Sequence, residues 1–231
     1  MASRTELREQ KEKTSAALIE AAIQLCAEEG YASLSLRSVA RKAGIAPTSF
    51  YRHFREIDEL GVAVVDQAKT VLEECMSQAR QKMLAYSITK RLQSEQSEQI
   101  LQSIECIVRP FVETFIEYFQ QNSHLLCLFF QEYTGSSEAM RRAIEQGINS
   151  MAKFLGEDLT RVSKQFPDGF GEISLIAESM ITIASHTCVV MTLSKECERI
   201  TITEQLIKKL NLLLLGASIY PRRMMQRNNN E

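Results

Sequence analysis

Apolar residues that recur every three or four positions are the dominant pattern in this 231-residue chain. The longest run is 58–84, where the apolar positions are Leu60, Val64, Ala68, Leu72, Met76, Ala79 and Met83. This spacing places them on one face of a helix, and a helix of that length is roughly 40 Å long. A chain built on such segments has to bury its apolar residues by packing helix against helix.

Turn-forming residues are scarce, which argues against folds made of short strands. The chain has 9 glycines and 4 prolines, about half of what average composition would supply. A sandwich or barrel needs a turn every ~10 residues, and this chain lacks the residues to make them. The sequence therefore predicts an all-α protein with about nine helices.

The other expected helices follow from the same periodicity. They are 12–29, 36–43, 47–54, 98–120, 125–133, 136–166, 172–194 and 206–219. The first ten residues are expected to form a mobile arm, 86–98 a connection and 167–169 a turn. The expected N-terminal caps are Ser33 or Ser35, Asp58, Ser136 or Ser137, and a capping box formed by Thr201 and Glu204.

The segment 172–194 is apolar on nearly all sides and long enough to cross a bilayer. It carries Glu172, Glu178 and His186 and lacks basic flanks, which favours a buried helix and no membrane span. Two such helices at the end of a chain of this size suggest packing against a second copy, as a symmetric homodimer.

The cysteines and the start of the chain indicate a reducing compartment. The six cysteines contain no CxxC pair, and no apolar run follows the charged first residues. We therefore expect a cytoplasmic protein with buried free thiols and no secretory leader. The sequence has no Walker loop, GxGxxG, GxSxG or HExxH, so no enzyme activity, catalytic residue, cofactor or metal site is predicted.

The most informative segment is 33–54, SLSLRSVARKAGIAPTSFYRHF. It reads as two short helices joined by a tight turn at Gly44. Small or apolar residues let the two helices cross closely: Val39, Ala40, Ala43, Ile45 and Phe50. This is the pattern of a helix-turn-helix, whose second helix enters the major groove of DNA.

Charge supports this interpretation locally. The whole chain carries a net charge of −2, from 27 basic and 29 acidic residues. Between Arg37 and Arg55, however, there are five cations and no acidic residue. A basic segment without acids is the expected footprint of phosphate neutralisation. The near-neutral total therefore hides one basic face, and double-stranded DNA is the expected partner.

Residue chemistry assigns roles within the segment. Thr48 and Ser49 can reach base edges or phosphates, whereas Tyr51 and His53 can each reach a phosphate oxygen. Arg52 can read a guanine or contact the backbone, and Arg37 is expected on a phosphate; Phe50 and Phe54 are expected in the core. The full candidate set is Ser35, Arg37, Pro47, Thr48, Ser49, Tyr51, Arg52 and His53. The alternative is a helical hairpin with a solvated charged face.

The segment AGIAPTSFYRHFREIDELG resembles the DNA-binding domain of the TetR family of bacterial regulators, with its Gly, Tyr and Phe followed by an acidic helix start. The 30 residues ASLSLRSVARKAGIAPTSFYRHFREIDELG strongly resemble one group within it, the FabR and DesT repressors of unsaturated fatty acid synthesis. A weaker similarity lies at 135–141. The resemblance implies a homodimeric repressor on an inverted-repeat operator, with an acyl-CoA or acyl-carrier-protein ligand. Gln131, Glu132 and Tyr133 stand where those repressors tend to be basic.

We therefore expect a DNA-binding domain at 1–57 and a helical ligand-binding and dimerisation domain at 58–231. The residues expected to line an apolar ligand cavity are Phe111, Phe115, Phe119, Phe129, Phe130, Phe154, Met180 and His186. The alternative for each is a plain bundle core. Two other functions stay open: a TetR-type regulator with another hydrophobic ligand, and a ligand-binding or scaffold protein whose N-terminal domain engages another protein.

Overall fold

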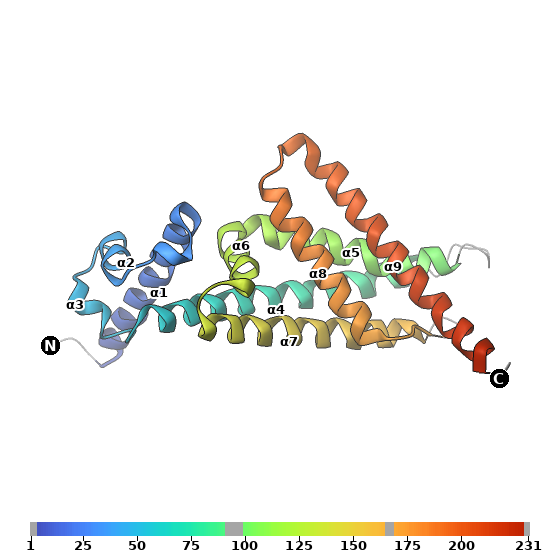
Figure 1. Cartoon of the computed structure of the whole chain (residues 1–231), viewed down its shortest axis with the longest axis horizontal. Helices are drawn as coiled ribbons and strands as arrows, with labels where there is room; N and C mark the ends of the chain where they lie inside the picture. The colour runs from blue at the N-terminus through green and yellow to red at the C-terminus, as the bar shows by residue number, and fades with distance from the viewer. Residues whose placement is uncertain (1–3, 91–98, 165–168, 229–231) are drawn as a thin grey trace. The chain divides into compact units, whose positions relative to one another are not determined.

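The structure, a computed structural model, describes residues 4–90, 99–164 and 169–228. Within these ranges it is made of nine α-helices and three short 3₁₀ helices, with no strand (Figure 1). The α-helices are α1 (Arg4–Glu29), α2 (Leu36–Lys42), α3 (Pro47–Phe50), α4 (Ile57–Lys90), α5 (Gln99–Gln121), α6 (Ser123–Gln131), α7 (Glu138–Ser163), α8 (Ile173–Thr192) and α9 (Arg199–Asn228). The 3₁₀ helices are η1 (Tyr31–Ser33), η2 (Glu132–Thr134) and η3 (Glu196–Glu198). The all-α prediction is confirmed.

The chain divides into two compact units. The first unit contains Met1–Thr70 and Asn122–Gln146, and the second contains Val71–Gln121 and Gly147–Glu231. The long helices α4 and α7 each contribute residues to both units. The predicted division into a DNA-binding domain at 1–57 and a ligand-binding and dimerisation domain at 58–231 concerns function and stays a prediction.

The core of the first unit forms around α1. Its buried residues include Leu18, Ala22 and Leu25, and the helix packs against both α2 and α6. Gly30 ends α1 with a φ of 79°, a conformation that costs glycine little and other residues much. Because α6 packs on the same helix, residues 122–131 belong to this unit although they lie far along the chain.

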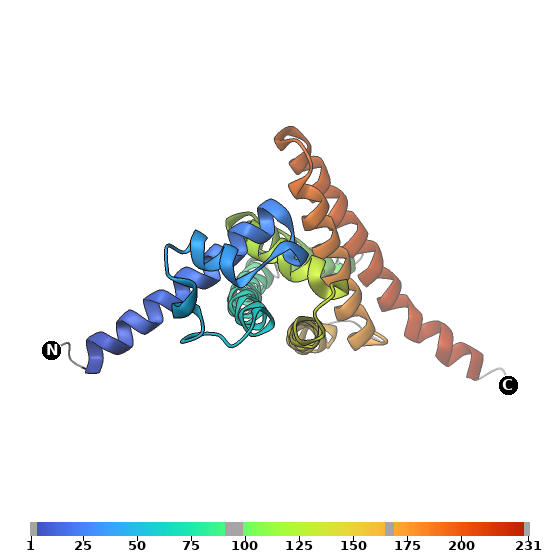
Figure 2. The same ribbon diagram turned by 60° about the vertical axis from the view of Figure 1, so that its left-hand side comes forward.

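The second unit is built on α5, α8 and α9, which pack against one another. Figure 2 shows α8 and α9, in orange and red, as a helical hairpin joined at η3. Pro110 lies inside α5 and the helix continues past it. Among the described residues, α8 alone is long and apolar enough to cross a membrane, and it packs against α5 and α9.

Several predicted helix ends are wrong. The helix α1 already begins at Arg4, so residues 4–10 are not an arm, and α3 ends at Phe50 with turns at 51–53. The helix α4 begins at Ile57, which places Asp58 in the first turn, where its carboxylate accepts a hydrogen bond from Tyr31. The predicted caps Ser35 and Ser137 are confirmed by hydrogen bonds from the backbone N–H of Ser38 and Met140.

The predicted capping box at Thr201 and Glu204 is also wrong, because α9 begins at Arg199 and both residues lie inside it. The Glu204 carboxylate instead pairs with the Arg109 guanidinium of α5 at 3.0 Å. Of the predicted connection 86–98, α4 covers the residues up to Lys90, while 91–98 lie outside the described residues. The predicted turn at 167–169 lies mostly outside them as well; Gly169 has a φ of 68°.

Candidate DNA-binding surface

The turn between α2 and α3 is closed by backbone hydrogen bonds. The N–H of Gly44 donates to the carbonyl of Arg41 at 3.2 Å, and the N–H of Ile45 donates to the carbonyl of Ala40 at 2.9 Å. Gly44 has a φ of 69°, which strains any residue with a Cβ. Pro47 occupies the first turn of α3, where its missing N–H costs nothing. The sequence therefore dictates two short helices joined by a tight turn.

Apolar residues hold the two helices together from behind. Val39, Ala40 and Phe50 have no exposed surface, and Phe54 is buried beside Phe50, with ring centroids 5.8 Å apart. Phe50 and Phe54 are thus core residues, as predicted. The rigid backing leaves the polar side chains of the segment on the outside.

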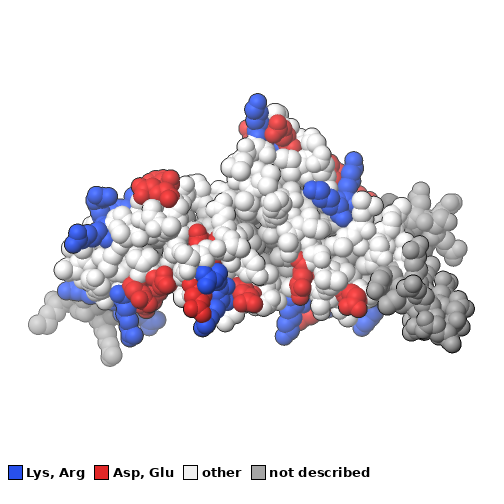
Figure 3. Space-filling model, viewed as in Figure 1, with Lys and Arg blue, Asp and Glu red and all other residues white. Residues whose placement is uncertain are grey.

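The predicted DNA-contacting residues lie on this outer side. Tyr51 is 64% exposed; Ser35, Arg37, Pro47, Thr48 and Arg52 are also exposed, whereas Ser49 and His53 are half-buried. Figure 3 shows basic side chains over the α2–α3 region. We call the eight residues Ser35, Arg37, Pro47, Thr48, Ser49, Tyr51, Arg52 and His53 the α2–α3 surface.

Most cations of this region are available to a ligand. Lys42 is paired with Glu28 of α1, with 2.9 Å between its Nζ and the carboxylate. Among the described residues, Arg37, Arg41, Arg52 and Arg55 have no carboxylate within ion-pair distance. Four uncompensated guanidinium groups on one short segment give a strong local attraction for phosphate.

His53 has an unusual environment in this surface. Its pKa lies below the ordinary value, first because the ring is partly buried and then because Lys11 and Arg52 are near. Its Nδ1 is buried without a hydrogen-bond partner. The ring is therefore neutral at neutral pH, and a phosphate would favour its charged form.

A buried cluster behind the surface was not predicted from the sequence. The Tyr31 hydroxyl donates a hydrogen bond to Asp58 Oδ1 at 3.0 Å and also meets the Ser137 hydroxyl. A Cβ added to Gly61 would lie 2.6 Å from Met140 Sδ and 2.7 Å from Tyr31 Oη. These contacts connect η1 with the first turns of α4 and α7. No local sequence pattern predicts them, because the residues involved are far apart in the sequence.

The predicted ligand-lining residues fall into two groups. Phe129 and Phe130 lie on α6 in the first unit, whereas the other six belong to the second. Phe111, Phe115, Phe119 and Met180 are buried there, Phe154 is half-buried and His186 is exposed. The role of all eight in ligand binding stays a prediction.

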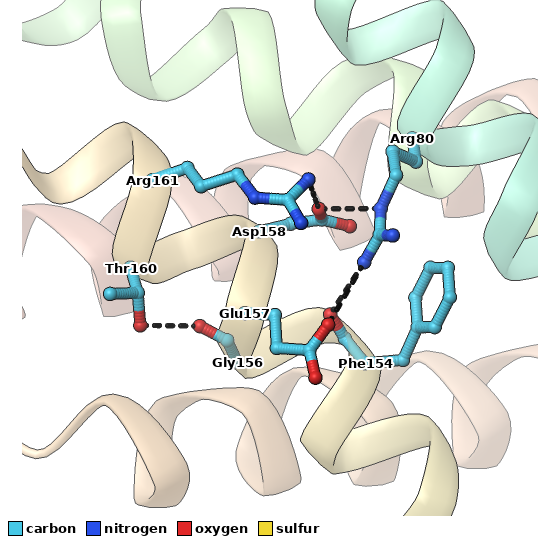
Figure 4. A network of polar contacts seen from close by, with 7 residues as sticks. All are labelled: Arg80, Phe154, Gly156, Glu157, Asp158, Thr160 and Arg161. Carbon is cyan, nitrogen blue, oxygen red and sulfur yellow. Dashed lines mark hydrogen bonds and ion pairs between the residues drawn. The ribbon is translucent and has the colours of Figure 1, made fainter.

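Phe154 takes part in a polar network of the second unit (Figure 4). The Arg80 guanidinium lies over its ring, 3.6 Å from the centroid. Arg80 Nε is 2.6 Å from Asp158 Oδ1, and Arg80 also contacts Glu157 and the Phe154 carbonyl. Burial raises the pKa of Asp158, although Arg80 and Arg161 oppose the rise. This network ties α4 to α7.

The cysteines of the chain differ in exposure. The cysteines at 26, 75, 106 and 188 are buried, Cys127 is half-buried and Cys197 is exposed. Burial raises the pKa of both Cys26 and Cys75 to about 12, which makes them poor nucleophiles. Within the part of the chain that the structure describes, no group of three or more His, Cys, Asp or Glu side chains could hold a metal ion.

One family model matches the part of the sequence that contains this surface, and several solved structures share the fold of the chain. Residues 18–64 match the family described as "Bacterial regulatory proteins, tetR family". The fold resembles the fatty acid degradation regulator FadR from Bacillus halodurans, at 18% identity over 88% of this chain and 95% of that chain, with a TM-score of 0.62.

Two other solved structures show the same fold. A tetR-family transcriptional regulator from Streptomyces coelicolor is 14% identical over 93% of this chain and 86% of that chain, with a TM-score of 0.65. The SmeT–triclosan complex is 14% identical over 88% and 91% of the two chains, with a TM-score of 0.62. At these identities the likeness concerns the fold.

Proposed function

We propose that this chain, whose residues 18–64 match the N-terminal domain of the TetR family, is a cytoplasmic transcriptional repressor that binds operator DNA as a homodimer. The observation that carries the proposal is the α2–α3 surface. The surface lies on a tight turn with an apolar backing, and its arginines, Arg37 and Arg52, together with the adjacent Arg41 and Arg55, have no carboxylate partner among the described residues. A helical hairpin whose charged face is merely solvated would not require the turn, the apolar backing and the unpaired arginines to occur together.

A mobility-shift titration of the purified protein tests the DNA-binding role. Wild-type protein first selects its duplex from a random-sequence library, and binding is then measured at several salt concentrations. Arg52→Ala should weaken binding and lower the salt slope by about one for each lost phosphate contact. Tyr51→Phe should also weaken binding, because it removes an exposed hydroxyl that can donate a hydrogen bond to a DNA phosphate.

The matched control is Lys153→Ala, an exposed cation of α7 in the second unit. It removes the same charge as Arg52→Ala but should leave DNA affinity unchanged. Affinities of Tyr51→Phe and Arg52→Ala equal to that of the wild type would contradict the assignment. No binding to any library duplex would favour the scaffold alternative.

The proposed homodimer is supported by exposed apolar residues on the α8–α9 hairpin. Of the large hydrophobic side chains that are exposed, six lie between residues 175 and 219: Leu175, Val190, Leu193, Ile200, Leu212 and Ile219. A second copy packed against this hairpin would remove apolar side chains of this kind from water. A second copy meeting it by two-fold symmetry would give two DNA-binding heads and an operator with inverted symmetry.

For the ligand we propose a long-chain acyl thioester, and with it a role in fatty acid synthesis. One support is the resemblance of residues 32–61 to repressors of unsaturated fatty acid synthesis. The other is the group of buried aromatic rings on α5, where the ring centroids of Phe111 and Phe115 are 5.7 Å apart. A ligand that fits one arrangement of the two heads better shifts the population toward it by its differential affinity.

A second candidate is another hydrophobic small molecule. It is favoured by the similarity in fold to SmeT, whose structure contains triclosan. Native mass spectrometry of the purified dimer separates the two. An acyl-thioester mass supports the first candidate, and another small-molecule mass supports the second. A dimer that carries no extra mass, and gains none from added oleoyl-CoA, would contradict the acyl proposal.

A further inference from the structure

The helix α1 is much longer than its packing requires. Its buried residues begin at Leu18, and the residues of its first half whose exposure is described are exposed or half-buried. The family match also begins at residue 18. Figure 2 shows the N-terminal turns of α1 extending past the other helices of the first unit. We call residues 8–15 of α1 the helical extension.

The helical extension is basic on one side. Arg8, Lys11 and Ser15 follow one another at spacings of three and four, and the same spacing continues to Leu18 and Ala22. They therefore share the side of α1 that is buried against the unit further along the helix. Glu9 and Lys13 fall on the opposite side by the same spacing. The side of the extension that faces the rest of the unit thus carries cations.

Two observations connect this side with the α2–α3 surface. The helix α1 packs against α2 within the same unit, and the charge of Lys11 is one of the causes that lower the pKa of His53. His53 is itself a member of the α2–α3 surface. Cations of the extension and cations of α2 and α3 therefore belong to the same unit, and the charge of Lys11 acts on a residue of the α2–α3 surface.

These cations are available to a ligand. Arg8 pairs with Glu12 one turn away at 3.0 Å, but both side chains are well exposed, and exposed pairs of this kind contribute little stability. Among the described residues, Lys11 has no carboxylate within ion-pair distance. A phosphate can replace Glu12 as the partner of Arg8 at little cost.

We propose that Arg8 and Lys11 bind backbone phosphates of the DNA beside the site that α3 contacts. The helical extension then acts as a second DNA-binding element, which positions the protein and adds affinity without reading bases. This inference rests on the proposed function, since it requires that the α2–α3 surface binds DNA.

The test compares two charge removals on one helix. The double variant Arg8→Ala/Lys11→Ala loses both cations of the basic side, whereas Lys13→Ala loses a cation of the opposite side. Alanine is the best helix former, so α1 is retained, which circular dichroism checks. Binding is measured on the library-selected duplex at several salt concentrations, beside wild type and Arg52→Ala.

The double variant should bind at least tenfold more weakly than wild type at moderate salt, with a salt slope smaller by about two per bound head. Lys13→Ala should match wild type. If the double variant binds as Lys13→Ala does while Arg52→Ala is weakened, the inference is overturned and the proposed function stands. If wild type binds no duplex, both fall.

Discussion

At the residue scale, the proposed DNA binding should depend on pH through His53. Its pKa in the free protein is below the ordinary value because of burial and the neighbouring Lys11 and Arg52. A nearby phosphate favours the protonated ring, so binding takes up a proton. DNA affinity should therefore rise several-fold as pH falls from about 8 to 6.

His53→Gln should flatten this pH dependence, and His124→Gln, a change at an exposed histidine of α6, should not. Mobility shifts at constant ionic strength measure both. An unchanged pH profile in His53→Gln would contradict the phosphate role of His53. Stability should change in the opposite direction: a histidine with a lowered pKa contributes stability above its ordinary pKa and loses it as pH falls.

Gly61 is a second residue with a measurable consequence. A Cβ there would lie within 3.0 Å of atoms of Met140 and Tyr31, so Gly61→Ala forces these side chains to move. We expect a loss of about 1–3 kcal/mol in the free energy of unfolding. Gly156→Ala is the matched control, because its Cβ would meet Ile173 and Ala177 at ordinary distances.

Chemical denaturation of both variants measures the difference. Gly156→Ala should be neutral or stabilising, since alanine is the better helix former. Equal free energies of unfolding for the two variants would mean that the side chains of Tyr31 and Met140 move aside without a loss of stability.

The sequence predicted some residue roles and missed others for a clear reason. Ser35 as a cap and Phe50 as a core residue follow from neighbours within four positions. The Tyr31–Asp58 hydrogen bond spans 27 positions, and the approach of Met140 to Gly61 spans more. Such contacts depend on how helices pack, which no local pattern encodes.

At the element scale, helix ends were the weakest part of the sequence reasoning. Asp58 and the Thr201–Glu204 pair have the chemistry of caps, yet both lie inside helices. A carboxylate that could cap a helix can equally interact with a residue distant in sequence. Asp58 accepts a hydrogen bond from Tyr31, and Glu204 forms an ion pair with Arg109. The helix α1 begins at Arg4, well before Leu18, the first buried residue among those described, and Arg8 and Glu12 form one i,i+4 ion pair in these exposed turns.

The connection between α4 and α7 can be tested at Arg80. Asp158 is only 8% exposed at its side chain and Arg80 23%, so Arg80→Ala leaves a buried carboxylate without its main partner. We expect a loss of about 3 kcal/mol or more in the free energy of unfolding at neutral pH. Arg142→Ala, which removes an exposed ion pair with Glu138, should cost less than about 1 kcal/mol.

The pH dependence of Arg80→Ala provides a second check. Without the guanidinium, the pKa of Asp158 rises further, so the folded state binds its proton more tightly than the unfolded state. The stability contributed by such a group is largest at low pH and falls as pH rises. The deficit of Arg80→Ala should therefore shrink in acid, and a constant deficit would show that Asp158 does not carry it.

At the scale of the whole molecule, the α8–α9 hairpin should decide the oligomeric state. Leu212 is 69% exposed on α9, and Leu212→Glu would place a charge in the proposed two-fold interface. We expect this variant to sediment as a monomer and to bind operator DNA about 10²-fold or more weakly, since the second head no longer adds avidity.

Leu101→Glu is the control, because Leu101 is an exposed leucine on α5. It should sediment as wild type does. Analytical ultracentrifugation settles the comparison, and a dimeric Leu212→Glu protein would place the interface elsewhere.

The sequence predicted the all-α architecture because helical periodicity and scarce turn residues are global signals. It did not predict that residues 122–146 join residues 1–70 in one unit. That grouping arises from packing of α6 on α1 and of Met140 on Gly61, which sequence order does not reveal.

The first unit is assembled from two separate segments of the sequence, Met1–Thr70 and Asn122–Gln146. This has a consequence for the engineering of chimeric regulators. A graft of residues 1–57 alone would leave behind α6 and Met140, and the buried faces of α1 and Tyr31 would meet a foreign scaffold. A transplanted head should therefore carry residues 122–146 as a second insert, with splice points in the middle of α4 and α7. In this chain, the modular piece is two segments of sequence that have to be exchanged together.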